Sequence, residues 1–222
     1  MAASKTAGDH AIALLLKHHS TESPPAGSAG AAVIIFLRPT PAGDDVEALL
    51  IQRTERVHDP ASGQVSLPGG RVDPGDQSLS DTALREAEEE VGLGAPDLAG
   101  PVRYIGTETA HAFGLRVGIF AGALSPRARA ASARSAEEVA DVFWLPRPAL
   151  ADRQRVAQPT RDGHREVDAT VLDGHVVWGF TRRILREFFG GTPPGGGPDW
   201  TPEPVRARGS STVPEGTRPS PD

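Results

Sequence analysis

A segment that joins a Gly-rich turn to a strongly acidic helix constrains this chain more than any other part of it. The segment runs from residue 69 to residue 93 and reads GGRVDPGDQSLSDTALREAEEEVGL. Ser78, followed three residues later by Asp81, forms a pair like a capping box and predicts a helix over Leu79–Val91. Gly92 stands where a left-handed C-terminal cap is usual. Four apolar residues recur at helical spacing and form the expected buried stripe: Leu79, Ala83, Ala87 and Val91.

The opposite face of this predicted helix carries three carboxylates close together. Glu86 and Glu90 stand at positions i and i+4, and Glu89 is at i+3 from Glu86, so the three side chains converge on one side. Like charges at this spacing repel by a few tenths of a kcal/mol per pair, on the order of 0.3 kcal/mol, and on the helix only Arg85 offsets them. A hard divalent cation such as Mg²⁺ or Mn²⁺ prefers oxygen ligands and would remove the conflict. The same cation binds phosphate oxygens, so the ligand set suggests a phosphate-containing substrate.

An acidic helix face also has an ordinary interpretation as a solvated surface. Taken alone, the sequence EAEEE favours that interpretation. The preceding Gly69-Gly70 pair changes the balance, because glycine lets the backbone approach a ligand closely at the same end of the element. We therefore hypothesise a metal-binding site here.

The segment resembles the Nudix box, written G-x5-E-x7-R-E-U-x-E-E-x-G-U, where U is aliphatic. The second half matches without a gap over Arg85–Leu93. In the first half, Asp76 stands in place of Glu with five residues between it and Gly70, and eight residues instead of seven separate it from Arg85. This variant is similar to the coenzyme A pyrophosphatase branch of the family. Several stretches outside the box are also similar to that branch: Arg53, Gly63–Val65 with Leu67–Gly70, Glu138–Val139 with Val142–Pro146, and Trp178–Thr181.

The resemblance covers roughly residues 30–190 and implies an α/β fold, the Nudix-type α/β/α sandwich with a mixed β-sheet. It also implies a metal-dependent hydrolase that cleaves a diphosphate bond. By this resemblance Glu86 and Glu90 are the core ligands of Mg²⁺ or Mn²⁺, and Glu89 is a third ligand or holds a metal-bound water. Such ions neutralise the diphosphate, lower the pKa of the attacking water and stabilise the leaving oxygen.

The resemblance implies further roles around the box. Arg85 is expected to orient a neighbouring carboxylate or the helix end more than to touch substrate. Glu138 or Glu137 is our candidate for the general base, although exposed acids before a strand are the ordinary interpretation of both. Arg53 is expected to clamp a substrate phosphate bidentately, with a surface charge at a strand end as the alternative. The Gly69-Gly70 pair is expected to offer backbone groups to metal or phosphate.

Composition limits the partners that this chain can have. The formal net charge of −6 provides no basic patch for nucleic acid. There are no cysteines, so a disulfide framework and a Cys-ligated zinc site are both excluded. The apolar run Ala11–Leu16 is shorter than the roughly 20 residues of a membrane span, and it lacks a basic region ahead of it. We expect a cytoplasmic protein with a small nucleotide-type substrate and with no nucleic-acid or membrane partner; a homodimer is left open.

The chain divides into three expected regions. Residues 1–28 hold a short helix over Asp9–His19, with Asp9 as its N-cap, and a linker. Residues 29–190 form the Nudix domain. Residues 191–222 contain eight Pro and six Gly and are expected to be a disordered tail, because such a stretch buries too little surface to offset its ordering entropy.

Within the domain, the patterns predict several strands, a hairpin and a closing helix. The predicted elements are strands at Ala31–Leu37, Val46–Arg53, Val102–Thr107, Arg116–Ala123 and Val142–Leu145, a hairpin of Arg165–Leu172 and His175–Trp178 around Asp173-Gly174, and a helix at Gly179–Phe189. Ser125–Ser135, rich in Ala and Arg, is expected to be a flexible crossover.

Two classes of function remain open. The first is a hydrolase of a nucleoside diphosphate linked to another group, with coenzyme A or its acyl thioesters as leading substrates and with ADP-ribose-like dinucleotides and nucleoside triphosphates after them. The second is a non-catalytic Nudix module that senses a nucleotide. Such sensors commonly carry a DNA-binding domain and a degraded acidic set, whereas Glu86, Glu89 and Glu90 are all present here, which favours the enzyme.

Overall fold

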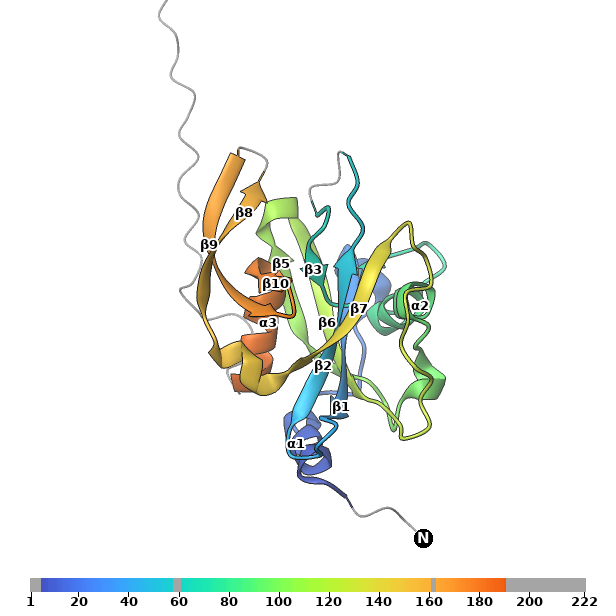
Figure 1. The fold of residues 1–222 in the computed structure, drawn as a ribbon. Helices are drawn as coiled ribbons and strands as arrows, with labels where there is room; N and C mark the ends of the chain where they lie inside the picture. Colours follow the sequence, from blue (N-terminus) through green and yellow to red (C-terminus); the bar gives the residue numbers. More distant parts are fainter. Residues whose placement is uncertain (1–4, 58–60, 161–162, 191–222) are drawn as a thin grey trace, which may run out of the picture.

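A seven-stranded mixed β-sheet forms the centre of the molecule (Figure 1). The computed structural model describes residues 5–57, 61–160 and 163–190. The sheet contains β1 (Ala31–Pro39), β2 (Val46–Arg53), β3 (Val65–Ser66), β4 (Gly69–Arg71), β5 (Arg103–Ala110), β6 (Leu115–Ala123) and β7 (Val139–Pro146). Its order is β3-β2-β1-β6-β5, with β4 paired to β1 and β7 paired to β2. The pairing of β1 with β6 is parallel and the other pairings are antiparallel, so the sheet is mixed.

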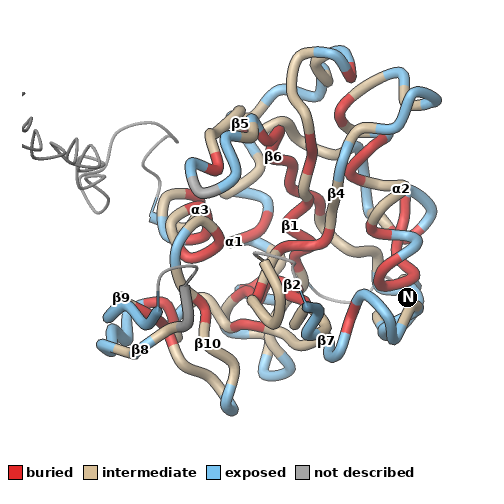
Figure 2. The backbone as a smooth tube through the Cα atoms, turned by 90° about the horizontal axis from the view of Figure 1, so that it is seen from above, coloured by how far each residue is buried: buried red, intermediate tan, exposed pale blue. Residues whose placement is uncertain are grey.

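Strand β1 lies at the middle of the sheet because its apolar run is buried on both faces. Ile34 and Phe36 pack with helix α2 (Leu79–Val91) on one face. Ile35 and Leu37 pack on the other face with residues of α1 (Ala7–Leu16) and α3 (Gly179–Gly190). Figure 2 shows the buried backbone concentrated along β1, β6 and the inner side of α2. These layers confirm the predicted α/β/α sandwich.

A second, three-stranded sheet follows in the order β10-β9-β8. Its strands are β8 (Gln154–Thr160), β9 (Gly163–Leu172) and β10 (His175–Trp178). The β9–β10 hairpin was predicted, and its turn has φ of 49° at Asp173 and 88° at Gly174, as a two-residue turn between twisted strands requires. Strand β8 was not predicted. It exists through antiparallel pairing with β9 over its whole length.

The predicted helix Asp9–His19 was wrong in its bounds and in its N-cap. Helix α1 begins at Ala7 and ends at Leu16, and its N-cap is Thr6 and not Asp9. The Thr6 hydroxyl accepts the N–H of Asp9 at 3.1 Å, and the Asp9 carboxylate accepts the N–H of Thr6 at 2.7 Å. This reciprocal pair is a capping box in which Asp9 is the third helical residue.

The strands β5 and β7 are longer than predicted. Strand β7 begins at Val139 because its pairing with β2 continues to the end of that strand, where Val139 lies opposite Arg53. The crossover before it is docked along α2, since the N–H of Ser132 bonds Val91 and the N–H of Arg134 bonds Glu90. The predicted tail, residues 191–222, lies outside the described residues. In the described ranges, no helix has both the length and the apolar character needed to cross a membrane.

Candidate active site

Helix α2 has the boundaries and the caps that its sequence predicts. The Ser78 hydroxyl accepts the N–H of Asp81 at 3.2 Å, and the Asp81 carboxylate accepts the N–H of Ser78 at 3.0 Å. Gly92 closes the helix in the left-handed region at φ 73°. All four residues of the predicted apolar stripe are fully buried. Glu90 is buried as well, with only 4% of its surface exposed, which is unusual for a carboxylate.

The two glycines of β4 allow this strand to lie between β1 and α2. The N–H of Gly69 donates to Glu90 Oε2 at 2.9 Å. Gly69 has φ of 140°, and a Cβ there would overlap the backbone of Ala32 and Val33. A Cβ on Gly70 would overlap the carboxylate of Glu86. Gly69 therefore requires glycine, whereas a side chain at Gly70 would displace the Glu86 carboxylate, so both glycines let the backbone lie directly against the acidic face of α2.

The carboxylates of Glu86 and Glu90 lie in an environment that disfavours their charge. Burial raises the pKa of Glu90 to about 7; the Gly69 N–H and the charge of Arg53 oppose that rise, while the charges of Glu86 and Glu138 add to it. Burial also raises the pKa of Glu86, against the hydrogen bond from Arg85 and with the charges of Glu89 and Glu138 adding to the rise. The charges of Glu138, from the turn before β7, and of Arg53, at the end of β2, therefore both influence the pKa of Glu90 on the helix.

Arg85 connects helix α2 to the turn before it through several hydrogen bonds. Its Nε and Nη2 donate to the two oxygens of Asp76, both at 3.0 Å, and its Nη1 donates to Glu86 Oε1 at 3.0 Å. Nη2 also donates to the Arg71 carbonyl at 3.1 Å. The Arg85 guanidinium holds the pKa of Asp76 well below its usual range, and the Thr82 hydroxyl donates to the same carboxylate at 2.8 Å. Asp76, which departs from the family pattern, is therefore the partner of Arg85.

The remaining predicted residues are more exposed. Glu89 has a side chain 59% exposed and an ion pair of 3.4 Å with Arg85. Glu138 is exposed, and its backbone carbonyl accepts the N–H of Thr54 at 3.0 Å. The carbonyl of Glu137 accepts two hydrogen bonds from the Arg56 guanidinium, at 2.8 and 2.5 Å.

The donor chemistry of the site fits a hard divalent cation. The carboxylates of Glu86 and Glu90 lie on the same side of α2, and the charge of Glu86 raises the pKa of Glu90. In the described part of the chain, no three His, Cys, Asp or Glu side chains are arranged as a complete metal cage. Mg²⁺ is commonly held by one or two carboxylates plus waters and substrate phosphates, so an incomplete protein cage agrees with this ion.

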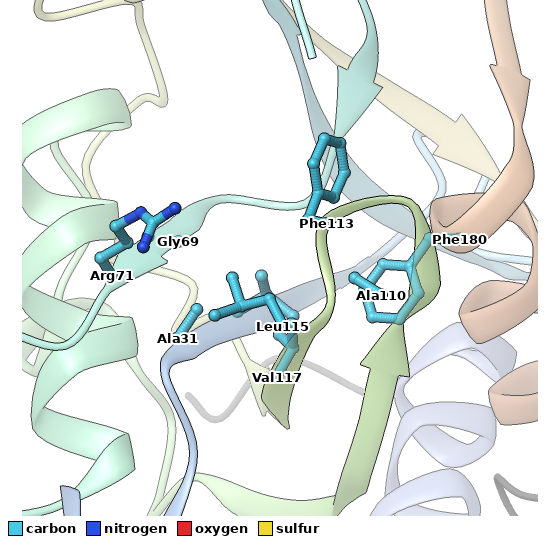
Figure 3. A pocket seen from close by; sticks show the side chains of 10 residues that line it. Ala31, Gly69, Arg71, Ala110, Phe113, Leu115, Val117 and Phe180 are labelled. Atoms are coloured by element: carbon cyan, nitrogen blue, oxygen red, sulfur yellow. The ribbon is translucent and has the colours of Figure 1, made fainter. Parts of the chain in front are cut away.

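A small apolar pocket of about 180 Å³ opens beside the glycines (Figure 3). One side of it is strand β4, from Gly69 to Arg71. Phe113, from the β5–β6 turn, and Phe180, from the start of α3, form the other side, and Leu115 and Val117 of β6 lie between the two sides. The pocket therefore shares Gly69 and Gly70 with the acidic face of α2.

The comparison with known sequences decides the family. The chain matches the NUDIX domain family over residues 28–171. It belongs to the Nudix hydrolases.

Two relatives align with most of the length of this chain. Human mitochondrial coenzyme A diphosphatase NUDT8 is 36% identical to this Nudix hydrolase over 168 residues, which is 72% of this chain and 67% of the relative. The NudL Nudix hydrolase of Cronobacter sakazakii is 35% identical over 169 residues, 72% of this chain and 79% of the relative. A solved NUDIX domain, that of Shewanella oneidensis NrtR in complex with ADP ribose, is 24% identical over 55% of this chain and 74% of that one, with a TM-score of 0.44. The last likeness is too remote to bear on the substrate.

Sequence reasoning missed several residues around the site of this Nudix hydrolase. Arg71 is exposed directly after the two glycines. Its position next to the Gly69-Gly70 pair is the sequence signal that could have identified it. Phe113 and Phe180 stand far apart in the sequence and meet only through the fold.

Proposed function

We propose that this Nudix hydrolase cleaves the diphosphate bond of coenzyme A or an acyl thioester of it, with Mg²⁺ or Mn²⁺ held by Glu86 and Glu90. The products would be 4′-phosphopantetheine and 3′,5′-ADP, with one water consumed. The observation that carries the proposal is the buried Glu90 carboxylate, bonded at 2.9 Å by the Gly69 N–H, beside Glu86. A buried pair of like charges is costly unless a cation compensates them.

The choice of coenzyme A over other diphosphates has two supports. The human relative is named as a coenzyme A diphosphatase. The box has Asp76 and one extra residue before Arg85, the variant similar to the coenzyme A pyrophosphatase branch.

We assign the following roles to the residues of the chain. When bound, the metal supplies charge neutralisation and a more acidic attacking water. Glu86 and Glu90 would hold it, and Glu89 would be a third ligand or hold one of its waters. Arg85, fixed on Asp76, would keep the Glu86 carboxylate in place. Positioning of this kind accounts for most of the catalysis in phosphoryl transfer.

Other side chains would act on the substrate itself. Glu138, exposed and close enough to raise the pKa of Glu86 and Glu90, is our proposed general base. Arg53 would bind a phosphate of the substrate, and Arg71, exposed beside Gly70, is a second candidate for the same role. Gly69 and Gly70 would let the diphosphate approach the backbone.

A panel of substrates tests the proposal. The purified full chain is incubated with Mg²⁺ or Mn²⁺ and with coenzyme A, ADP-ribose, NADH or deoxynucleoside triphosphates, and products are identified by mass. We expect coenzyme A to give 4′-phosphopantetheine and 3′,5′-ADP at the highest rate. Preferred cleavage of ADP-ribose or of the triphosphates would overturn the substrate, and absence of any cleavage would favour a nucleotide-sensing module.

Glu90→Gln tests the role of the buried carboxylate. We expect turnover to fall by about 100- to 1000-fold, the size of effect seen when one essential electrostatic group is removed. The melting temperature should not fall, because glutamine keeps an acceptor for the Gly69 N–H and removes a buried charge. The matched control is Glu88→Gln on the same helix, since Glu88 is exposed and pairs with Arg129 at 2.6 Å. Full activity in Glu90→Gln would refute the ligand assignment.

A further inference from the structure

The pocket between β4 and the two phenylalanines adjoins the place where the proposed function puts the diphosphate. Gly69 and Gly70 line the pocket; on the other side of β4 the Gly69 N–H bonds Glu90, and a Cβ on Gly70 would meet Glu86. Strand β4 alone therefore separates the pocket from the acidic face of α2, and a substrate whose diphosphate passes over Gly69 and Gly70 would place the first atoms beyond its phosphate in or beside this pocket.

The pocket is large enough for a small fragment and too small to enclose a nucleoside. Its volume is about 180 Å³, whereas sites that enclose a whole drug-sized ligand measure about 300–1,000 Å³. The pocket suits a group of a few heavy atoms.

The lining of the pocket is apolar. Among the described residues that line it, Arg71 alone has a polar side chain, and that side chain is exposed on the β4 side (Figure 3). Phe113, Phe180 and Val117 offer only carbon. A sugar hydroxyl placed against them would lose its hydrogen bonds to water without a replacement, which is unfavourable.

The two classes of candidate substrate differ at this position. In coenzyme A, the phosphate is followed by one methylene and then by a carbon that bears two methyl groups, the branched part of the pantoyl unit. In ADP-ribose and in dinucleotides, the phosphate is followed by one methylene and then by a hydroxylated ribose ring. Only the first class presents a compact apolar group one methylene away from the phosphate.

From these observations we infer that the pocket of Phe113, Phe180 and Val117 binds the dimethyl carbon of the pantoyl unit and thereby selects coenzyme A over ribose-linked diphosphates. The inference rests on the proposed function for the location of the diphosphate. It adds a specificity determinant outside the Nudix box, formed by the β5–β6 turn and the start of α3.

The test compares coenzyme A with an analogue that lacks the two methyl groups. Each buried methyl group contributes about fourfold in binding, so kcat/KM for coenzyme A should exceed that for the analogue by about 15-fold. In Phe113→Ala and in Phe180→Ala the ratio should fall below about threefold. Because both substrates are measured on the same variant, partial loss of folded protein cancels from the ratio. Phe113 is 43% exposed, so its replacement should leave the fold intact.

Leu14→Ala is the control, because Leu14 is also a large exposed apolar residue, at 56% exposure, on helix α1 and outside the pocket. Its ratio should remain that of the wild type. A wild-type ratio near one, or a ratio that persists in both phenylalanine variants, would overturn the inference while leaving hydrolysis of coenzyme A intact.

Binding of 4′-phosphopantetheine, followed by saturation-transfer NMR, separates this inference from the proposed hydrolysis. We expect the strongest transfer at the two methyl signals, and we expect Phe113→Ala to remove it. If coenzyme A is not cleaved but this transfer is seen, the proposed function fails and the pocket assignment stands. If the methyl signals receive no transfer, the pocket assignment fails whatever the enzyme cleaves.

Discussion

Two residues before α2, Gly69 and Gly70, leave no room for a side chain, and at Gly70 the obstacle is a proposed metal ligand. Any side chain there would overlap the carboxylate of Glu86, which Arg85 holds from the other direction at 3.0 Å. The side chain of Glu86 is 21% exposed, so a methyl group at residue 70 would turn the carboxylate away from its present position. The identity of residue 70 thus determines where a proposed metal ligand points.

Gly70→Ala should therefore reduce activity much more than stability. A displacement of about 1 Å in a catalytic group can cost about 100-fold in rate, and we expect a loss of that order in kcat. The melting temperature should change by only a few degrees, because a partly exposed carboxylate can rotate away from the new methyl group.

Gly75→Ala is the matched control in the same turn. A Cβ there would lie 3.4 Å from Asp73 Oδ1, an ordinary contact, so both kcat and the melting temperature should stay close to those of the wild type. Equal activity of the two variants would show that Gly70 is not needed to position Glu86.

At the scale of elements, helix α2 is fixed at its C-terminal side by the segment that follows β6. Arg129 in this segment bonds Glu88 on the helix and Asp97 just beyond it, each at 2.6 Å. Asp97 is 3% exposed and also accepts the N–H of Gly94 at 2.9 Å. The crossover Ser125–Ser135 was predicted to be flexible from its composition. In the structure it is bonded to the C-terminal end of α2 through Arg129.

Asp97→Asn should destabilise the fold by about 2 kcal/mol at pH 7, because a buried carboxylate loses charge-assisted hydrogen bonds. The bonds from Arg129 hold the pKa of Asp97 well below its usual range. Its folded pKa is thus below the unfolded value of about 3.9, so this stabilisation is complete above that pH and is lost as the pH falls through the folded pKa. Urea unfolding at several pH values measures the difference between wild type and variant, which should shrink below about pH 4.

Asp152→Asn is the control for that series, since Asp152 is exposed and exposed substitutions usually change stability by less than about 0.5 kcal/mol. A difference for Asp97→Asn that stays constant down to pH 2 would contradict the assigned role of its charge.

The elements that the sequence predicts well are those with local signals. Helix α2 carries its caps and its stripe in one continuous segment, and the β9–β10 hairpin carries its Asp173-Gly174 turn. Strands β3 and β4 have only two and three residues, too few for a pattern, and they exist because β2 and β1 supply their hydrogen-bond partners.

The same distinction applies to the site. Glu86, Glu89, Glu90 and Arg85 could be proposed from spacing on one helix. The pocket residues Phe113 and Phe180 could not, because no local pattern brings the β5–β6 turn to the start of α3.

For the whole molecule, the described ranges form the layered core that the Nudix family requires. The sheet is covered on one face by α2 and on the other by α1 and α3, whose residues Ile184, Leu185 and Phe188 are buried. Helix α3 completes this packing by Gly190. Residues 191–222, with their high Pro and Gly content, follow it.

Removal of residues 191–222 should therefore preserve both the melting temperature and kcat with coenzyme A, within about twofold for the rate. Activity and thermal unfolding of the chain ending at Gly190, set beside those of the full chain, check this expectation. A complete loss of activity would show that the C-terminal residues take part in folding or catalysis.

The most direct measurement is the binding of Mn²⁺ to the purified full chain, followed by electron paramagnetic resonance of the free ion. We expect wild type and Glu88→Gln to bind Mn²⁺ at millimolar or lower concentration. The double variant Glu86→Gln/Glu90→Gln should bind at least about 100-fold more weakly, because changes even beyond the direct ligands commonly cost about 10–100-fold. Wild-type protein that binds no Mn²⁺ at millimolar supply, or a double variant that binds as tightly as the wild type, would contradict a metal site built on these two glutamates.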